Sequence, residues 1–126
     1  MILVDTDVLI WYLRGNEKAY KTIEALESFS ISVVTYMELV QGMRNRKELN
    51  SLCQALHAWN CKILYITEEI SAKAMFAVEQ HFLSHSIQLA DALVGSTAIA
   101  HGIPLLTGND KHYKIMKGLQ IKRFRQ

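Results

Sequence analysis

The feature that most constrains the fold is a regular alternation between short apolar runs and longer stretches with helical periodicity. The runs are rich in Val, Ile and Leu, and such runs are typical of strands buried on both faces of a parallel sheet. Strands that alternate with helices favour a three-layer α/β/α domain whose central sheet has four to five mainly parallel strands. The expected strands are residues 2–4, 31–34, 62–66, 103–106 and 120–124.

Helices are expected between these strands, and several carry start or stop signals. Thr35 and Glu38 match the Thr-x-x-Glu capping box, which predicts a helix that begins at Thr35. Thr67, followed by two glutamates, predicts another helix start, and Gly102 predicts a helix end. The expected helices are residues 8–13, 17–28, a helix from 35 onward, 46–59, 67–84 and 88–100.

Length, charge and cysteine content narrow the class of protein. A chain of 126 residues suits one domain, which we expect to span residues 1–126. The formal charge of +2 permits an anionic partner without requiring one, and the two cysteines cannot form a metal site alone. No apolar run approaches the roughly 20 residues that span a bilayer, and acids stand where a signal peptide needs apolar residues. We therefore expect a cytoplasmic protein.

Acidic and amide side chains stand near the ends of four expected elements. Asp5 comes directly after the first strand, and Glu38 lies in the first helical turn after the second. Asn109 and Asp110 follow the fourth strand, and Asp91 lies near the start of the helix that leads into it. Because ligands bind beyond the carboxyl ends of parallel strands, we expect these side chains to meet at one rim of the sheet.

The chemistry of this group points to a divalent cation. Crowded carboxylates repel one another unless a cation lies among them, and hard oxygen ligands suit Mg²⁺ or Mn²⁺. Such an ion polarises a phosphate and lowers the pKa of a bound water. The pattern predicts phosphodiester hydrolysis without a covalent enzyme intermediate. The candidate catalytic residues are Asp5, Glu38, Asp91, Asn109 and Asp110.

Each of these residues also has a purely structural interpretation. Asp5 fits a helix N-cap, Glu38 fits the acidic partner in a capping box, and residues 109–110 fit a turn. Asp91 lies between apolar neighbours, where an unpaired charge is costly, and this favours a ligand role. Asp7 fits either a supporting acid or a solvated residue of the first helical turn.

With these residues identified, the chain resembles the PIN-domain family, and in particular the VapC-type toxin ribonucleases of type II toxin-antitoxin systems. The resemblance covers essentially the whole chain. One matching block alone would be weak, but four in the right order and at the right distances are specific. The blocks are residues 2–10, 32–39, 88–94 and 105–113.

The resemblance implies a PIN-like fold and a role for each site residue. In the family's pattern Asp5, Glu38 and Asp91 bind Mg²⁺ or Mn²⁺. The fourth position falls on Asn109 or Asp110, and the pattern leaves open which of them reaches the metal. Supporting roles fall on Thr6, Asp7, Thr35 and Thr107.

The resemblance also implies cleavage of single-stranded or structured RNA, a homodimer and neutralisation by a cognate VapB-type antitoxin protein. Basic residues that flank an acidic pocket suit the phosphates on either side of a cut bond, although a solvated surface explains them equally well. Trp11 and Trp59 fit either a protein-contact surface or the core. The candidate substrate-binding residues are Arg44, Arg46, Lys111, His112 and Lys114.

Two other functions remain compatible with the residues. The segment from Asp5 to Asp7 is similar to the nucleophile and acid pair of haloacid-dehalogenase-like phosphatases, in which Asp5 would form an aspartyl-phosphate. Those enzymes usually have Thr or Val where this chain has Leu9, and a later acidic pair that residues 109–110 only half supply. The second alternative is a catalytically silent RNA- or protein-binding domain whose acids are structural.

Overall fold

The central sheet is parallel, as expected. The computed structural model describes residues 1–83 and 87–126. Within them, five strands lie in the order β3-β2-β1-β4-β5, and each strand pair is parallel. The strands are β1 (Leu3–Val4), β2 (Phe29–Ser32), β3 (Cys61–Leu64), β4 (Leu105–Thr107) and β5 (Ile121–Arg123).

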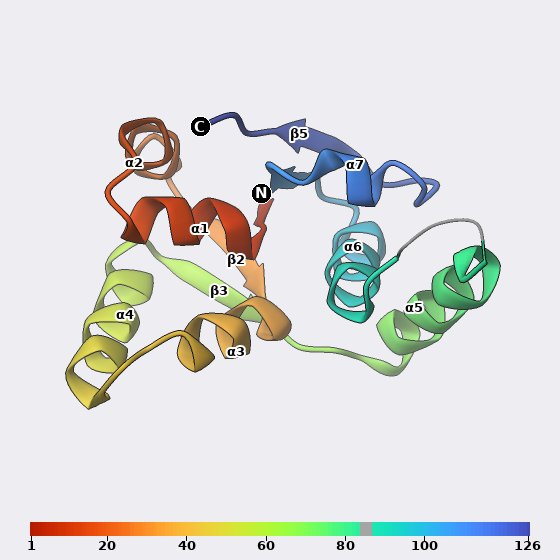
Figure 1. Ribbon diagram of the computed structural model, residues 1–126, viewed down its shortest axis with the longest axis horizontal. Coiled ribbons are helices and arrows are strands. Elements are labelled where there is room, and N and C mark those ends of the chain that lie inside the picture. Colours follow the sequence, from red (N-terminus) through yellow and green to blue (C-terminus); the bar gives the residue numbers. More distant parts are fainter. Residues whose placement is uncertain (84–86) are drawn as a thin grey trace.

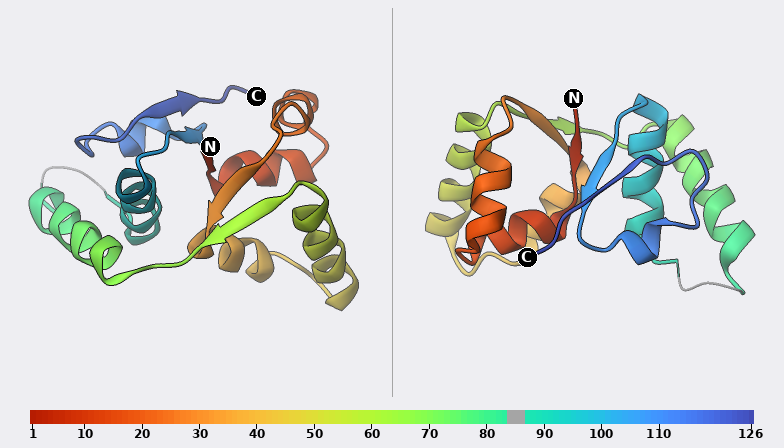
Figure 2. Two further views of the ribbon diagram at one scale, coloured as in Figure 1. Left: turned by 180° about the vertical axis from the view of Figure 1, so that it is seen from behind. Right: turned by 90° about the horizontal axis from the view of Figure 1, so that it is seen from above.

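Helices cover both faces of this sheet and produce the three-layer arrangement. Figures 1 and 2 show α1, α2 and α4 on one side of the sheet and α5 and α6 on the other. In the described part of the chain the helices are α1 (Thr6–Leu13), α2 (Glu17–Glu24), α3 (Val33–Gln41), α4 (Arg46–Ala58), α5 (Glu68–His81), α6 (Leu89–His101) and α7 (Asp110–Tyr113).

Each face of the sheet has its own apolar core. On one face, Val4 and Phe29 of the strands are buried in the same cluster as side chains of α1 to α4. Trp11 and Trp59 pack against this cluster as partly buried side chains. On the other face, Leu3 and Leu105 are buried with side chains of α5, α6 and α7. Successive strand residues therefore serve opposite cores, as a sheet covered on both sides requires.

The strand order places two strand ends side by side at the centre of the sheet. The chain runs from β1 outward through β2 to β3, and then returns to pair β4 with the free side of β1. The amide N–H of Asp5, just after β1, donates to the carbonyl of Leu106 in β4 at 2.9 Å. This reversal of strand order is the position where open parallel sheets bind ligands. Asp5 and the residues after β4 therefore lie at the place where a site is expected.

The expected capping box at Thr35 is wrong. Strand β2 ends at Ser32, two residues earlier than expected, and the Ser32 side chain caps α3 by accepting from the N–H of Val34 at 3.0 Å. Because the serine hydroxyl satisfies a free amide at the first turn, the helix begins before the threonine. Thr35 is therefore a buried residue inside α3, and Glu38 lies in the second turn rather than the first.

Other differences concern element ends. Helix α2 stops at Glu24 instead of residue 28, and β3 ends at Leu64 instead of residue 66. Helix α5 ends at His81; the expected end at Ser84 lies outside the described residues. The expected turn at residues 109–110 leads into the short helix α7. Across the described ranges, none of the helices is both long and apolar enough to cross a membrane.

Candidate active site

Asp5 is the buried centre of the site. It is 5% exposed and stands between β1 and α1, where its Oδ1 accepts from the N–H of Thr6 at 2.9 Å. Its Oδ2 accepts from the hydroxyl of Thr107, at the end of β4, at 2.8 Å. The capping role considered for Asp5 is thus real, but capping uses only one of its oxygens. The other oxygen ties the ends of β1 and β4 together.

The electrostatics around Asp5 disfavour its charged form in the absence of a cation. Burial raises the pKa of Asp5 to about 7, and the charge of Asp7 adds to this effect. The hydrogen bonds from Thr107 and Thr6 lower the pKa but do not outweigh burial. A carboxyl with such a raised pKa takes up a proton near neutral pH unless a positive charge lies beside it.

Asp7 belongs to the same rim of the sheet and is not a solvated helix residue. Its Oδ2 accepts from the N–H of Gly108 at 2.9 Å, and its Oδ1 is buried without a hydrogen-bond partner among the described residues. Burial raises the pKa of Asp7, although the bond from Gly108 partly offsets the rise. A Cβ atom at position 108 would lie 2.6 Å from Asp7 Oδ2. Glycine is therefore required here by close approach.

Glu38 is linked to the site by hydrogen bonds that involve two threonines. The Thr6 hydroxyl donates to Glu38 Oε1 at 2.6 Å, and the hydroxyl oxygens of Thr6 and Thr35 lie 2.9 Å apart. Thr35 is fully buried, whereas Glu38 is exposed. Because Thr35 does not cap α3, the structural interpretation of Glu38 as its capping partner no longer applies. The two residues instead face α1 from the side of α3.

Asp91 approaches Asp5 from α6, and a buried tyrosine lies near both. Asp91 Oδ2 is buried without a hydrogen bond from the described residues, although His112 Nδ1 lies 3.4 Å away. Tyr113 is fully buried, and its hydroxyl likewise has no hydrogen-bond partner among the described residues. Burial, followed by the charges of Asp5 and Asp91, raises the pKa of Tyr113 far above its usual value. Both carboxylates therefore lie close to one hydroxyl group.

The two residues at the fourth position differ sharply in environment. Asp110 is 8% exposed, and its carboxylate pairs with Arg125 Nη2 at 3.0 Å and with Arg123 Nε at 3.6 Å. Burial alone would raise the pKa of Asp110, but the hydrogen bond and charge of Arg125, helped by Arg123, leave it below its usual value. Asn109 is exposed, and its N–H donates to the Thr107 hydroxyl oxygen at 3.0 Å.

These residues fit a hard divalent cation in chemistry, but they do not form a closed cage. Within residues 1–83 and 87–126, no group of three His, Cys, Asp or Glu side chains is arranged to hold a metal ion. However, buried carboxylate oxygens of Asp7 and Asp91 accept no hydrogen bond from the described part of the chain, and the pKa of Asp5 is raised to about 7. Unpaired buried carboxylate oxygens are the donors that Mg²⁺ or Mn²⁺ would satisfy.

The candidate substrate-binding residues fall into two groups. Lys111, His112 and Lys114 lie on or just after α7, next to the carboxylates. Arg44 and Arg46 lie at the turn between α3 and α4 instead. The Arg44 side chain forms an ion pair with Glu48 at 2.6 Å. This ion pair holds the Arg44 guanidinium beside the first turn of α4.

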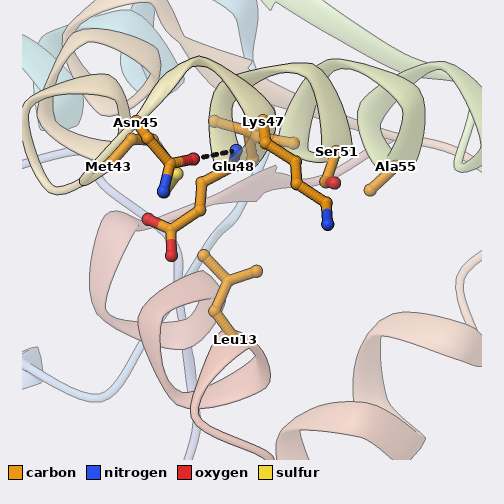
Figure 3. A pocket seen from close by; sticks show the side chains of 8 residues that line it. Leu13, Met43, Asn45, Lys47, Glu48, Ser51 and Ala55 are labelled. Carbon is orange, nitrogen blue, oxygen red and sulfur yellow. Dashed lines mark hydrogen bonds between the residues drawn. The ribbon is translucent and has the colours of Figure 1, made fainter.

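A hollow near that turn is separate from the carboxylates. It has a volume of about 510 Å³ and lies between the end of α1 and α4, with Leu13, Met43 and Ser51 among its lining residues. Figure 3 shows the lining side chains and the hydrogen bond from the Glu48 N–H to Asn45. Its lining shares no residue with the carboxylate site, so this hollow is not the active site.

Sequence reasoning missed some contributors to the site. Gly108 was part of a matching block, but its close contact with Asp7 depends on how β4 lies beside α1. Tyr113 follows His112 in the same block, and only the packing of α7 places it by the carboxylates. Arg125 was not among the candidate residues, and its pairing with Asp110 requires β5 to lie beside β4.

Comparisons with known proteins identify the family of the chain. The family model described as PIN domain matches residues 2–118. The chain is 33% identical over 126 residues to Ribonuclease VapC10 of Mycobacterium tuberculosis, with 95% of this chain and 91% of the relative covered. It is 32% identical to Ribonuclease VapC1 of Methanocaldococcus jannaschii, with 96% of this chain and 85% of the relative covered.

Solved structures show the same fold. A toxin-antitoxin complex from Klebsiella pneumoniae contains a chain that is 26% identical, with a TM-score of 0.74 and coverage of 94% of this chain and 95% of that chain. VapBC2 from Rickettsia felis, bound to a DNA fragment from its promoter, contains a chain that is 23% identical. Its TM-score is 0.78, with 99% of this chain and 100% of that chain covered.

Proposed function

The chain belongs to the PIN domain family, and from this premise we propose that it is a divalent-metal-dependent endoribonuclease that acts as the toxin of a toxin-antitoxin pair. The observation that carries the proposal is the group of buried carboxylates at the strand-order reversal. Asp5, Asp7 and Asp91 bring negative charge to one place, and buried oxygens of Asp7 and Asp91 accept no hydrogen bond from the residues that the structure describes. Such a site is costly unless it binds a cation.

We assign the cation to Asp5 and Asp91, with Glu38 and Asp7 bound to it directly or through its water ligands. When bound, Mg²⁺ or Mn²⁺ supplies charge that polarises a phosphate and acidifies a water. The protein's own contribution is orientation. Thr107 holds Asp5 through Oδ2, Thr6 holds Glu38 through Oε1, and the Gly108 N–H holds Asp7.

For the fourth position we propose Asn109 rather than Asp110. The Asp110 carboxylate forms ion pairs with two arginines, whereas Asn109 is exposed and hydrogen-bonded to Thr107. An amide oxygen at this position adds a ligand without adding another negative charge to a rim that already holds several.

We propose two protein partners. The first is a VapB-type antitoxin, because solved relatives of this chain are toxin-antitoxin complexes. The second is another copy of this chain, because large apolar side chains on and just after α5 are exposed, among them Met75, Phe76, Phe82 and Leu83. Exposed apolar patches of this kind mark protein contact surfaces. We place the protein in the cytoplasm, where RNA and a co-expressed antitoxin are both present.

A cleavage assay tests the proposed activity. End-labelled RNA is incubated with the purified chain in Mg²⁺, in Mn²⁺ and in EDTA, and with the variants Asp5→Asn and Asp91→Asn. Glu17→Gln on α2 is a matched control, because Glu17 is exposed and pairs with Lys21 on its own helix. We expect cleavage by wild type and control in either metal, and none in EDTA or with the site variants. Undiminished cleavage in EDTA would refute metal dependence.

The same preparation separates the alternatives. A haloacid-dehalogenase-like phosphatase would hydrolyse a small aryl phosphate and trap phosphate on Asp5, whereas we expect neither. A catalytically silent binding domain would bind RNA but leave it intact in every metal. Circular dichroism of each variant shows whether a lost activity reflects the site or an unfolded chain.

A further inference from the structure

A second hollow adjoins the carboxylates on the side of α1 and the C-terminal residues. It has a volume of about 520 Å³, which lies within the range of small-ligand pockets. Asp7 and Asn109 line it next to the proposed metal site, Trp11 lines it from α1, and Lys111 and Arg125 supply cations. We call it the Trp11 hollow.

Arg125 is held in place at the edge of the Trp11 hollow. Its Nη2 donates to Asp110 Oδ1 at 3.0 Å, and its Nη1 donates to the carbonyl of Phe124 at 3.1 Å. The side chain is nevertheless 52% exposed. Because Arg123 also pairs with Asp110, two guanidinium groups surround one carboxylate. The cluster keeps a net positive charge, to which Lys111 adds, and Asp110 acts as a positioning residue for Arg125.

Trp11 gives the Trp11 hollow an aromatic wall. Its indole packs in part against the apolar core of α1 to α4, which supports the ring, and the same residue lines the hollow. Arg14 lies over the same ring, 5.8 Å from its centroid. A supported ring beside fixed cations matches the way proteins bind single-stranded nucleic acid, with bases stacked on aromatic rings and phosphates paired with basic groups.

We propose that the Trp11 hollow binds a nucleotide of single-stranded RNA next to the cleaved bond, with its base stacked on Trp11 and its phosphate held by Arg125 and Lys111. The inference rests on the proposed function, since it places the RNA strand relative to the proposed metal site. The carboxylates of an acidic peptide would pair with the same cations, but such a peptide has no base to stack on Trp11. The combination of Trp11 with the cations therefore favours RNA.

A binding experiment tests the Trp11 hollow without requiring cleavage. The protein carries Asp91→Asn to prevent cleavage and Trp59→Phe, which leaves Trp11 as the one tryptophan of the sequence. We expect a short single-stranded RNA in Mg²⁺ to quench Trp11 fluorescence. An acidic peptide of equal charge is expected to leave it unchanged. Quenching by the peptide at equal concentration, or no quenching by RNA, would overturn the proposal.

Affinity measurements on labelled RNA then identify the contacts. We expect Arg125→Gln to weaken binding about tenfold and to reduce the salt dependence of binding by about one phosphate contact. Trp11→Leu is expected to weaken binding about fivefold or more through lost stacking. Lys62→Gln is the matched control, because Lys62 is exposed on β3 at the opposite edge of the sheet. Equal affinities for Arg125→Gln and Lys62→Gln would overturn the proposal.

Steady-state kinetics separate this inference from the proposed function. In otherwise wild-type protein, we expect Arg125→Gln to raise KM for RNA about tenfold while kcat stays within about twofold. If the chain cuts RNA but Arg125→Gln behaves like Lys62→Gln, the Trp11 hollow is not the subsite and the nuclease assignment stands. If wild type cuts no RNA, the proposed function fails, and the fluorescence experiment still decides whether RNA enters the Trp11 hollow.

Discussion

Replacing Asp5 by asparagine should leave the stability of the metal-free protein nearly unchanged at acidic pH and raise it at basic pH. The pKa of Asp5 is raised from 3.8 to about 7 in the folded chain, first by burial and then by the charge of Asp7. In metal-free protein between these two values, the folded state keeps a proton that the unfolded state has released. The stabilisation that Asp5 provides through its raised pKa is therefore fully present below pH 3.8 and is lost as pH rises through about 7.

The structure allows the size of this effect to be worked out. The difference between 3.8 and about 7, at about 1.36 kcal/mol per pH unit, amounts to about 4 kcal/mol lost by the wild type between pH 4 and pH 8. Asparagine has no such loss, and like the protonated carboxyl it keeps one strong acceptor oxygen for the hydrogen bonds that Asp5 receives from Thr6 and Thr107. Asp5→Asn should therefore be close to wild type in stability at pH 4 and more stable by up to about 4 kcal/mol at pH 8.

Urea denaturation followed by circular dichroism in EDTA measures this difference at several pH values. Glu17→Gln controls for the loss of an exposed acid. Added Mg²⁺ at pH 8 should stabilise wild type more than Asp5→Asn. A difference between wild type and Asp5→Asn that stays constant from pH 4 to pH 8 would show that the burial argument is wrong.

Three other substitutions probe the packing around the site. Gly108→Ala places a Cβ 2.6 Å from Asp7 Oδ2, so we expect RNA cleavage to fall at least tenfold. Circular dichroism should show that the fold is retained, and unchanged cleavage would contradict the close approach. Ser32→Ala removes the cap of α3 and should cost about 0.5–2 kcal/mol in urea denaturation. Gly95→Ala places a Cβ 2.4 Å from Met116 Sδ, and overpacking should lower stability by about 1–3 kcal/mol; Gly42→Ala, with no contact under 3.5 Å, is its control and should be neutral.

Local patterns predicted the fold and the main acids because their causes are local. An apolar strand and a helix start or end are each determined by a few neighbouring residues. The structure confirms the helix start at Thr67 and the helix end at Gly102. The position of Asp5 after the first strand follows in the same way. The helix start predicted at Thr35 was wrong because Ser32, three residues earlier, caps the helix instead. That Ser32 is the cap depends on where β2 ends.

Long-range features were out of reach for the same reason. The environment of Asp110 depends on β5 lying beside β4, since this pairing brings Arg123 and Arg125 to the carboxylate. The sequence pattern alone could not distinguish Asn109 from Asp110 as the fourth residue. The exposure of Trp11 to a hollow likewise depends on the path of the residues after β5.

The central position of the first strand has a consequence for synthesis of the protein. The hydrogen bonds that orient Asp5 and Asp7 come from Thr107 and Gly108, which are separated from them by 102 and 101 residues along the chain. A ribosome must therefore release β4 and the residue after it before these carboxylates acquire their partners. A nascent or prematurely terminated chain that lacks β4 cannot assemble the site. The cell that makes this protein is thus exposed to a completed site only after Thr107 and Gly108 have been translated and have left the ribosome.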